Sequence, residues 1–464
     1  MTNITIVGLG PGDASLLTVE ARETLEGAQE VYLRTTRHPT VASLPPHLTR
    51  HSFDHLYEAE DEFSVVYEEI ARRIVTLGQR QEGVIYAVPG HPLVGEESVR
   101  CILALAEDMG LEVSMVTGIS FIEAALEALR IDPLDGLQIV DATILAHHLH
   151  PNLDPDLPAL IGQLYNRRVA AEVKLTLMNL YPADHPVTLV RKVGTPQLET
   201  ETSPLHELDH SKDIDHLTSL YLPPLPNPSS LSTFQDIVAR LRAPGGCPWD
   251  REQDHQTLRR HLLEETYEVL QALDEEDDVA LREELGDLLL QIILHSQIAT
   301  ESGEFTLAQV LETIIAKIVR RHPHVFAGLE VADADEVLRN WQAIKRAEKP
   351  EEDKPFGGMP LSMPALTLAQ RAQERAKREG LASPSQEGLL VEIERRLDTL
   401  REVEGEEDAA AALGQLLFAL ANLGRLLGVD AESALRIATR HFGETLTPLG
   451  SEGHSSEDQS DSTQ

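Results

Sequence analysis

The chain has 464 residues, 42% of them hydrophobic and 25% charged, which is the composition of a soluble protein with two to four domains. Its formal net charge of −38 at pH 7 argues against a nucleic-acid backbone or an anionic membrane as a partner. The two cysteines, the expected absence of a membrane-spanning stretch and the absence of signal-peptide features predict a cytoplasmic protein that binds neither nucleic acid nor membrane.

A glycine-rich turn follows the first predicted strand, residues 4–8. The turn, GLGPGD, is followed by a helix predicted over residues 15–28, with Ser15 as its N-cap. Two similar loops come later, where predicted strands lead into PGHP at 89–92 and GIS at 118–120. Glycines let a backbone approach a ligand closely, and three such strand-end loops predict one crevice at the carboxyl ends of parallel strands.

The motifs GLGPGD, PGHP and VTGIS resemble those of the tetrapyrrole (corrin/porphyrin) methylase family. The resemblance implies that residues 1–222 form an α/β domain of two subdomains, with S-adenosylmethionine in the cleft between them. The binding residues implied are Gly10, Pro11, Gly12, Asp13, Pro89, Gly90, Pro92, Gly118 and Ser120. The alternative is that these residues only shape turns. No group specific for tetrapyrrole chemistry stands out, so methylation of an acceptor stays open.

A proline-rich linker, predicted at residues 223–230, separates this domain from a helical region. Residues 243–246, APGG, break the first helix, and CPWD at 247–250 is predicted as a loop. Hydrophobic periodicity predicts helices over 231–241, about 254–273, 279–302, 306–322 and 335–349.

Acidic residues form two clusters in this region. Glu264, Glu265 and Glu268 lie on one face of the second helix, and Glu284 and Asp287 lie on one face of the third. Most acidic runs are solvated helix faces. Here the acidic residues between the helices predict a short turn, which brings the clusters face to face. Such carboxylates repel one another unless a cation compensates, and Mg²⁺ or Mn²⁺ suits their hard oxygens.

The motifs GGCPWD, LEETYEV, REELGDLL, KIVRRHPHVF and NWQAIKRAEK resemble the successive motifs of the MazG family. The resemblance covers residues 231–445 and implies an all-α helical bundle, with a catalytic half at 231–350. It implies a homodimer, formed through these helices, that cleaves nucleoside triphosphates to nucleoside monophosphate and diphosphate with Mg²⁺. Nucleotide pool housecleaning is the implied role.

The five carboxylates divide into metal ligands and a catalytic group. Glu265, Glu268, Glu284 and Asp287 are predicted to bind the metal. Glu264 forms the catalytic set with Glu265 and Glu268. It either completes the ligand shell or orients and deprotonates the attacking water.

Basic and aromatic side chains are candidates for binding the substrate. They are Lys317, Arg320, Arg321, Lys345, Trp249 and Trp341. The first three share a helix face, which is either a solvated basic face or a phosphate clamp. Each tryptophan either stacks on a nucleobase or packs in a core or hinge.

Residues 351–445 resemble a second MazG half that has lost its acids. Arg395 and Arg396 lie where the family repeats its first acidic cluster. Ala412 and Gln415 occupy the two positions where the family repeats the acids of the second cluster. This half is therefore predicted to serve packing or dimerisation without binding metal. The polar tail at 446–464 is predicted to be disordered.

Two other functions compete with pyrophosphohydrolysis. One is an S-adenosylmethionine-dependent methyltransferase with an accessory MazG part. The other is a non-catalytic nucleotide-binding or regulatory module, and the complete set of five carboxylates argues against it. Nothing in the sequence selects among ribonucleoside triphosphates, deoxyribonucleoside triphosphates, damaged nucleotides and other compounds that contain pyrophosphate.

Overall fold

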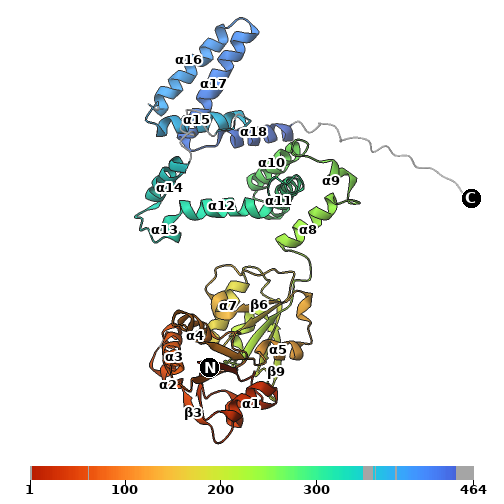
Figure 1. Ribbon diagram of the computed structural model, residues 1–464. Coiled ribbons are helices and arrows are strands. Elements are labelled where there is room, and N and C mark those ends of the chain that lie inside the picture. The colour runs from red at the N-terminus through yellow and green to blue at the C-terminus, as the bar shows by residue number, and fades with distance from the viewer. Residues whose placement is uncertain (1–2, 61, 349–358, 361, 382–383, 446–464) are drawn as a thin grey trace, which may run out of the picture. The chain divides into compact units, whose positions relative to one another are not determined.

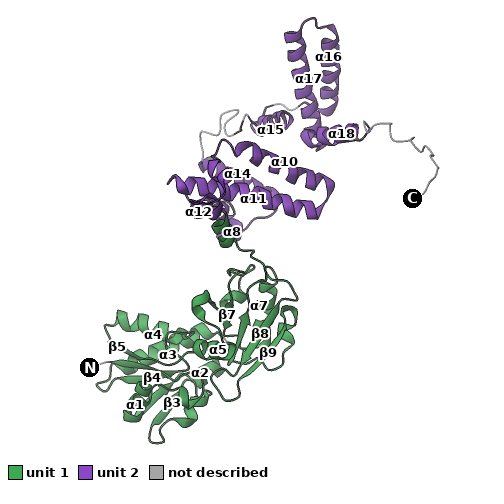
Figure 2. Ribbon diagram, turned by 90° about the vertical axis from the view of Figure 1, so that its right-hand side faces the viewer, with its two compact units in different colours: residues 1–237 green, residues 238–464 purple. Residues whose placement is uncertain are grey.

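The computed structural model describes residues 3–60, 62–348, 359–360, 362–381 and 384–445 (Figure 1). The chain divides into two compact units, residues 1–237 and residues 238–464 (Figure 2). Two predictions fall outside the described residues: the disordered tail at 446–464 and the start of the second MazG half at 351–358.

A five-stranded parallel sheet of order β3-β2-β4-β1-β5 forms the first subdomain of unit 1 (Figure 1). Its strands are β1 Ile4–Gly8, β2 Glu30–Leu33, β3 Thr49–Ser52, β4 Val84–Val88 and β5 Val113–Val116. Its helices are α1 Val19–Gly27, α2 Asp54–Ala59, α3 Phe63–Gly78, α4 Glu97–Asp108 and α5 Phe121–Leu129. Successive strand residues point to opposite faces, so Ile6 belongs to one buried core and Val7 to another.

A second sheet, of order β6-β7-β10-β8-β9, completes unit 1. Only β6 and β7 pair in parallel, and the other pairs are antiparallel. The elements are β6 Gln138–Asp141, α6 Ala142–Ala146, β7 Ala159–Gly162, α7 Arg167–Leu177, β8 Pro186–Arg191, β9 Glu199–Pro204 and β10 Thr218–Leu222. Unit 1 therefore has the predicted α/β fold with two subdomains.

The helix after the first glycine-rich turn begins later than predicted. Ala14–Leu16 forms a 3₁₀ turn capped by Asp13, which accepts hydrogen bonds from the backbone N–H and the hydroxyl of Ser15 at 2.8 and 2.6 Å. Thr18 is the N-cap of α1, because its hydroxyl accepts from the N–H of Ala21. The prediction of Ser15 as the N-cap is wrong, because Ser15 is itself a donor to the preceding cap.

Residues 223–230 contain no helix or strand and join β10 to α8 Leu231–Arg242. The carboxylate of Asp156 accepts hydrogen bonds from the N–H groups of Ser229 at 2.7 Å and Ser230 at 3.1 Å. The C-terminal end of this segment is thus attached to unit 1, and the division between the units falls inside α8.

The described part of unit 2 is helical throughout, as predicted. Figure 1 shows α10 paired with α11 and α16 paired with α17. The helices after α8 are α9 Pro248–Glu252, α10 Arg259–Glu275, α11 Asp278–Glu301, α12 Leu307–Arg321, α13 Pro323–Phe326, α14 Ala334–Glu348, α15 Ala365–Arg378, α16 Gln386–Glu402, α17 Glu406–Leu427 and α18 Ala431–Thr445.

Two residues make the turn between α10 and α11. Glu276 ends α10 in the left-handed conformation, with φ of 53°. Asp277 caps α11, because its carboxylate accepts from the N–H groups of Val279 and Ala280. A turn this short makes the two helices antiparallel neighbours.

Two local predictions before α10 are wrong. The segment predicted as a loop contains the short helix α9, with Pro248 at its first position, where a missing N–H is harmless. α10 begins at Arg259 rather than near 254. The Asp254 carboxylate accepts hydrogen bonds from the N–H groups of Gln256 and Thr257 and forms a separate turn.

Helix α17 corrects a further prediction. It has 22 residues and contains an 18-residue window with a mean hydropathy of 1.4, so it is long and apolar enough to cross a membrane by length and composition. The prediction that no stretch has these properties is therefore wrong. α17 packs against α15 and α16, and core helices of soluble proteins have the same composition, so this helix is weak evidence for a membrane.

Candidate active site

Three predicted metal ligands lie together between α10 and α11. One carboxylate oxygen from each of Glu265, Glu268 and Glu284 lies within 4.8 Å of the others. Glu265 and Glu268 share a face of α10, and Glu284 comes from α11. Asp287, one turn after Glu284, acts electrostatically on both Glu265 and Glu284. The hairpin therefore places the two acidic clusters face to face.

Burial and repulsion destabilise the charged forms of these carboxylates. Burial, a hydrogen bond with Glu268 and the charges of Asp287, Glu268 and Glu264 raise the pKa of Glu265 to about 7. Burial and the neighbouring acids also raise the pKa of Glu284. A divalent cation relieves this repulsion, and a donor set made only of carboxylate oxygens fits Mg²⁺ or Mn²⁺.

Glu264 connects the acidic cluster to an aromatic pair. Its Oε2 lies 3.5 Å from Nδ1 of His261, and the ring centroids of His261 and Trp249 are 5.9 Å apart in an edge-to-face contact. Trp249, a predicted substrate-binding residue, is 51% exposed. Sequence reasoning missed His261, although it lies three residues before Glu264 and four before Glu265, on the same helix face.

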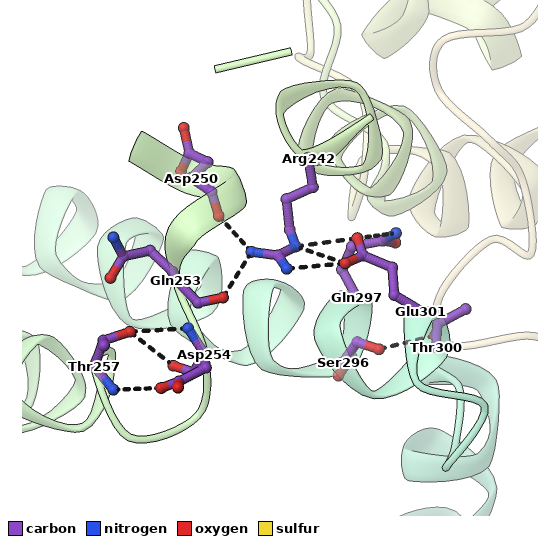
Figure 3. A network of polar contacts seen from close by, with 9 residues as sticks. All are labelled: Arg242, Asp250, Gln253, Asp254, Thr257, Ser296, Gln297, Thr300 and Glu301. Atoms are coloured by element: carbon purple, nitrogen blue, oxygen red, sulfur yellow. Dashed lines mark hydrogen bonds and ion pairs between the residues drawn. The ribbon is translucent and has the colours of Figure 1, made fainter. Parts of the chain in front are cut away.

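Arg242 anchors the segment that carries Trp249 (Figure 3). Its Nε and Nη2 donate to the carboxylate of Glu301 on α11 at 2.8–3.1 Å. Its Nη1 donates to the backbone carbonyls of Asp250 and Gln253. The polar network therefore fixes the connection between α8 and α10 onto α11. No sequence pattern pointed to Arg242, because its partners are set by tertiary packing.

Four other predicted substrate-binding residues gather where α12 meets α14. Glu348 accepts hydrogen bonds from Arg321 at 3.1 Å and Arg320 at 2.7 Å, and these bonds lower its pKa to about 2. The Arg321 guanidinium lies 5.1 Å and the Lys345 Nζ 5.7 Å from the centroid of the Trp341 ring. Sequence reasoning missed Glu348, which forms ion pairs with both arginines and offsets one of their two charges.

Lys317, the remaining basic candidate, is half-buried on α12. It has no ion pair in the described part of the chain. Among the described residues, no hydrogen bond or ion pair links Lys317 or the α12–α14 group to the carboxylates of α10 and α11. The described residues of the predicted site thus form an acidic group and a basic group that share no direct polar contact.

The second hairpin holds an arginine where the first holds acids. Arg396 of α16 donates to Oε1 of Gln415 on α17 at 2.7 Å and lies 2.8 Å from the carboxylate of Glu392. Ala412 of α17 offers no ligand. Within the described residues, the cluster on α10 and α11 is the only group of acids, histidines or cysteines close enough to share a metal ion.

The glycine-rich loops of unit 1 meet at the carboxyl ends of β1, β4 and β5. Gly10 and Gly90 form a β-bridge with N–O distances of 3.2 and 2.8 Å. A Cβ on Gly8 or Gly118 would lie 2.6 or 2.2 Å from the carbonyl oxygen of Gly90. Packing of the loops on one another therefore requires glycine at these positions.

The first loop also contacts the second subdomain. The N–H of Asp13 donates to the carbonyl of Gly194 at 2.7 Å, and Pro11 packs closely on Gly194. A Cβ on Gly12 would lie 2.7 Å from the side chain of Thr195. The first loop therefore helps to join the two subdomains.

The second and third loops leave space at one glycine. Pro89 is half-buried, Pro92 is buried, and the hydroxyl of Ser120 caps α5 by accepting from the N–H of Ile122. Gly90, with φ of 65°, is different, because a Cβ there would meet only the Cα of Ser120, at 4.0 Å. Open space therefore lies beside the backbone of Gly90.

Comparison with known proteins assigns both halves. Residues 3–209 match the tetrapyrrole (corrin/porphyrin) methylases, and residues 253–326 match the MazG nucleotide pyrophosphohydrolase domain. The chain is 40% identical over 456 residues to the uncharacterized protein YabN of Bacillus subtilis, with 95% of this chain and 91% of YabN covered. It belongs to the MazG family. Its MazG domain follows a methylase domain, as predicted.

Relatives of the MazG domain have named activities. The nucleoside triphosphate pyrophosphohydrolase/pyrophosphatase MazG of Thermotoga maritima is 43% identical over 220 residues, covering 47% of this chain and 85% of that protein. The nucleoside triphosphate pyrophosphohydrolase of Escherichia coli K12 is 40% identical over 214 residues, covering 44% and 81%. A solved uroporphyrin-III-C-methyltransferase from Thermus thermophilus is 20% identical, covers 48% of this chain and 94% of that chain, and has a TM-score of 0.38.

Proposed function

We propose that the MazG domain is a Mg²⁺-dependent nucleoside triphosphate pyrophosphohydrolase, which converts a nucleoside triphosphate and water to the monophosphate and diphosphate. The observation that carries the proposal is the carboxylate cluster of Glu265, Glu268 and Glu284. The relatives from T. maritima and E. coli bear the name of this activity. Removal of unwanted nucleotides from the cellular pool is the role that we assign to it.

Each carboxylate has a part in the proposed reaction. Glu265, Glu268, Glu284 and Asp287 hold the metal ion. Bound Mg²⁺ neutralises phosphate charge, lowers the pKa of water and stabilises the leaving diphosphate. Glu264 is the base that takes a proton from the attacking water, because it lies outside the group of three close carboxylates and its contact with His261 offers that proton a route to solvent.

The candidate substrate-binding residues support the proposal unequally. Trp249 offers an exposed ring beside the acidic cluster, where a nucleobase can stack. Arg320 and Arg321 share the carboxylate of Glu348, which reduces the positive charge that they offer to phosphate. Lys317 and Lys345 have no ion pair among the described residues and are the cations available to a triphosphate. We assign Trp341 to the same basic group, through its contacts with Arg321 and Lys345.

Exposed apolar side chains support a homodimer formed through the MazG helices. Several large apolar side chains on α10, α11 and α12 are 39–58% exposed. They include Leu263, Leu285, Leu289, Ile315 and Ile318. Apolar surface of this extent marks an interface, and a second copy of the chain would cover it.

A second function, S-adenosylmethionine-dependent methyl transfer, is favoured for the methylase domain by the open space beside Gly90. There the backbone can approach a cofactor closely, with Ser120 on the adjoining loop and Asp13 holding the first loop in place. Isothermal titration of the full chain with S-adenosylmethionine tests this function. Binding that is lost in Gly90→Val is the expected result, and no binding to the wild type contradicts it.

The proposed domain limits follow the sequence. Residues 1–222 form the methylase domain, 223–230 the linker, 231–350 the catalytic MazG half and 351–445 a second half without metal. Arg396 and Gln415 support the last assignment, because their hydrogen bond takes the place of a carboxylate pair.

An assay of diphosphate release tests the proposed function. Purified full chain is mixed with nucleoside triphosphates and Mg²⁺, and diphosphate and monophosphate are measured together. We expect equal amounts of both products, complete loss with EDTA and recovery with Mg²⁺ or Mn²⁺. Release of orthophosphate, or activity that EDTA leaves unchanged, contradicts the proposal.

A further inference from the structure

A buried ion pair lies in the methylase domain, outside the glycine-rich loops. Arg34 directly follows β2, and Glu96 directly precedes α4, so both lie at the carboxyl edge of the parallel sheet. Nη1 of Arg34 donates to Glu96, whose side chain is only 4% exposed. Burying two charges costs more solvation free energy than apolar packing would. A pair kept at the edge where α/β domains bind ligands therefore indicates a binding function.

The guanidinium of Arg34 has a free donor. Its Nε donates to the hydroxyl of Tyr57 at 3.2 Å. Within the described residues no group accepts a hydrogen bond from Nη2, and the hydroxyls of Tyr67 and Tyr165 have no hydrogen-bond partner either. Burial raises the pKa of Tyr67 to about 12, although the charge of Arg34 opposes the rise, so this hydroxyl is a neutral donor. Three donors are thus available in one region.

Aromatic rings surround these donors. Tyr57, Phe63 and Tyr67 come from α2 and α3, and their ring centroids lie 6.1–6.3 Å from one another. Phe63 also contacts Tyr165 of the second subdomain, with centroids 6.2 Å apart. Phe63 is 45% exposed. The donors therefore lie beside an accessible aromatic wall at the junction of the two subdomains.

Polar contacts hold this region in place. The hydroxyl of Thr35, next to Arg34, donates to Asp54 at 2.6 Å. Gln163 lies two residues before Tyr165, the ring that the second subdomain contributes. Its φ is 60°, and its side-chain amide donates to the backbone carbonyl of Gly95 at 3.0 Å. Left-handed backbone at a non-glycine residue persists where its surroundings enforce it, often at a ligand site. The site is formed before any ligand arrives, which lowers the cost of binding.

We propose that Arg34, Tyr67 and Tyr165 bind the carboxylate of a small aromatic acid, whose ring packs on Phe63 and Tyr57. A guanidinium with an open N–H suits a carboxylate, and tyrosine hydroxyls add neutral donors. The rings offer edge-to-face contacts to a planar ligand. Glu96 competes with the ligand for Arg34. The proposal concerns the methylase domain alone and does not depend on nucleotide hydrolysis by the MazG domain.

Saturation-transfer NMR of the full chain with benzoate as the probe tests the proposal. We expect a benzoate signal, a much weaker signal with uncharged benzyl alcohol, and at least about tenfold weaker benzoate binding in Arg34→Met/Glu96→Gln. The double variant leaves no lone buried charge. Arg72→Met, which removes an exposed arginine of α3, is the matched control and keeps wild-type binding. No benzoate signal, or equal binding to the folded double variant, overturns the proposal.

A second variant keeps the test decisive if the double variant does not fold. Glu96→Gln alone removes the carboxylate that competes for Arg34, so we expect severalfold tighter benzoate binding. Tyr67→Phe removes one donor and weakens binding about twofold to tenfold. Unchanged affinity in both single variants overturns the proposal.

Discussion

The two helical hairpins of unit 2 share their architecture and differ in their electrostatics. Between α10 and α11, Glu265, Glu268 and Glu284 crowd together, and burial and repulsion raise the pKa of two of them. Between α16 and α17, Arg396 bonds Gln415 at 2.7 Å instead. In the proposed site the first hairpin takes a cation from solution, whereas the second contains the cation of Arg396. The helix pair is compatible with either arrangement.

Apolar layers explain why the second hairpin survives without a metal. Leu389, Ile393, Leu416 and Ala419 form a buried cluster between α16 and α17. This cluster holds the helices together through the hydrophobic effect, whatever the polar side chains do. Under the proposed function, loss of acids removes metal binding without removing the fold, so one chain can contain a catalytic hairpin and a structural one.

Removal of a carboxylate from the first hairpin has the largest expected effect. Glu268→Ala or Asp287→Ala lowers kcat for nucleoside triphosphate hydrolysis by about a thousandfold or more, because loss of the metal removes several kcal/mol of transition-state stabilisation. Diphosphate release measures this loss, and circular dichroism shows that the helices remain. Asp398→Ala on α16 is the matched control and keeps full activity. Full activity in either first-hairpin variant contradicts the proposed site.

Introducing acids into the second hairpin tests whether carboxylates alone are enough to create a metal site there. Arg396→Glu combined with Ala412→Glu and Gln415→Asp replaces the internal cation with carboxylates that suit a hard divalent ion. We expect about one additional Mn²⁺ bound per chain, measured by equilibrium dialysis or electron paramagnetic resonance. Unchanged stoichiometry in the folded variant shows that the two hairpins differ in more than these side chains.

The acidic site was predictable because helix geometry fixes it. Spacings of three and four residues place carboxylates on one face, and a short polar turn brings two faces together. The α/β domain was similarly evident from strand-end loops at regular spacing. In both cases short-range sequence patterns determine the arrangement.

Short-range sequence patterns could not predict contacts between elements that are distant in the sequence. Glu348 pairs with Arg320 and Arg321 only because α14 packs on α12, and Arg34 meets Glu96 across 62 residues of sequence. A side chain that ends a helix or strand has many candidate partners, and tertiary packing selects among them. The exposed leucines of α10 and α11 illustrate the same point, because periodicity identifies an apolar face and not what covers it.

The pH dependence of stability also distinguishes the two hairpins, with a smaller expected effect. The pKa of Glu265 is raised from 4.5 to about 7, so the folded metal-free chain binds more protons than the unfolded chain between these values. Stability therefore falls as pH rises from 4.5 to about 7 and then levels off. The melting temperature with EDTA should fall across this window. Mg²⁺ should remove the decline, because it binds the deprotonated carboxylates.

The controls for the pH series lie in both hairpins. Glu265→Gln should weaken the decline with EDTA. Glu392 of the second hairpin has a lowered pKa, because Arg395 and Arg396 stabilise its charge, so Glu392→Gln should leave the decline intact. An identical slope in Glu265→Gln and the wild type contradicts the assignment of this pH dependence to the acidic cluster.

Removal of the internal cation has the smallest expected effect. Arg396→Met breaks the hydrogen bond to Gln415 and the ion pair with Glu392, and this partly exposed pair contributes about 1 kcal/mol or less. Chemical denaturation of the full chain, with and without Mg²⁺, measures the loss. We expect the same loss under both conditions, because the proposed function places no metal in the second hairpin. A loss that Mg²⁺ reverses would mean that the arginine variant recruits a cation to α16 and α17, and the two hairpins would then differ in degree rather than in kind.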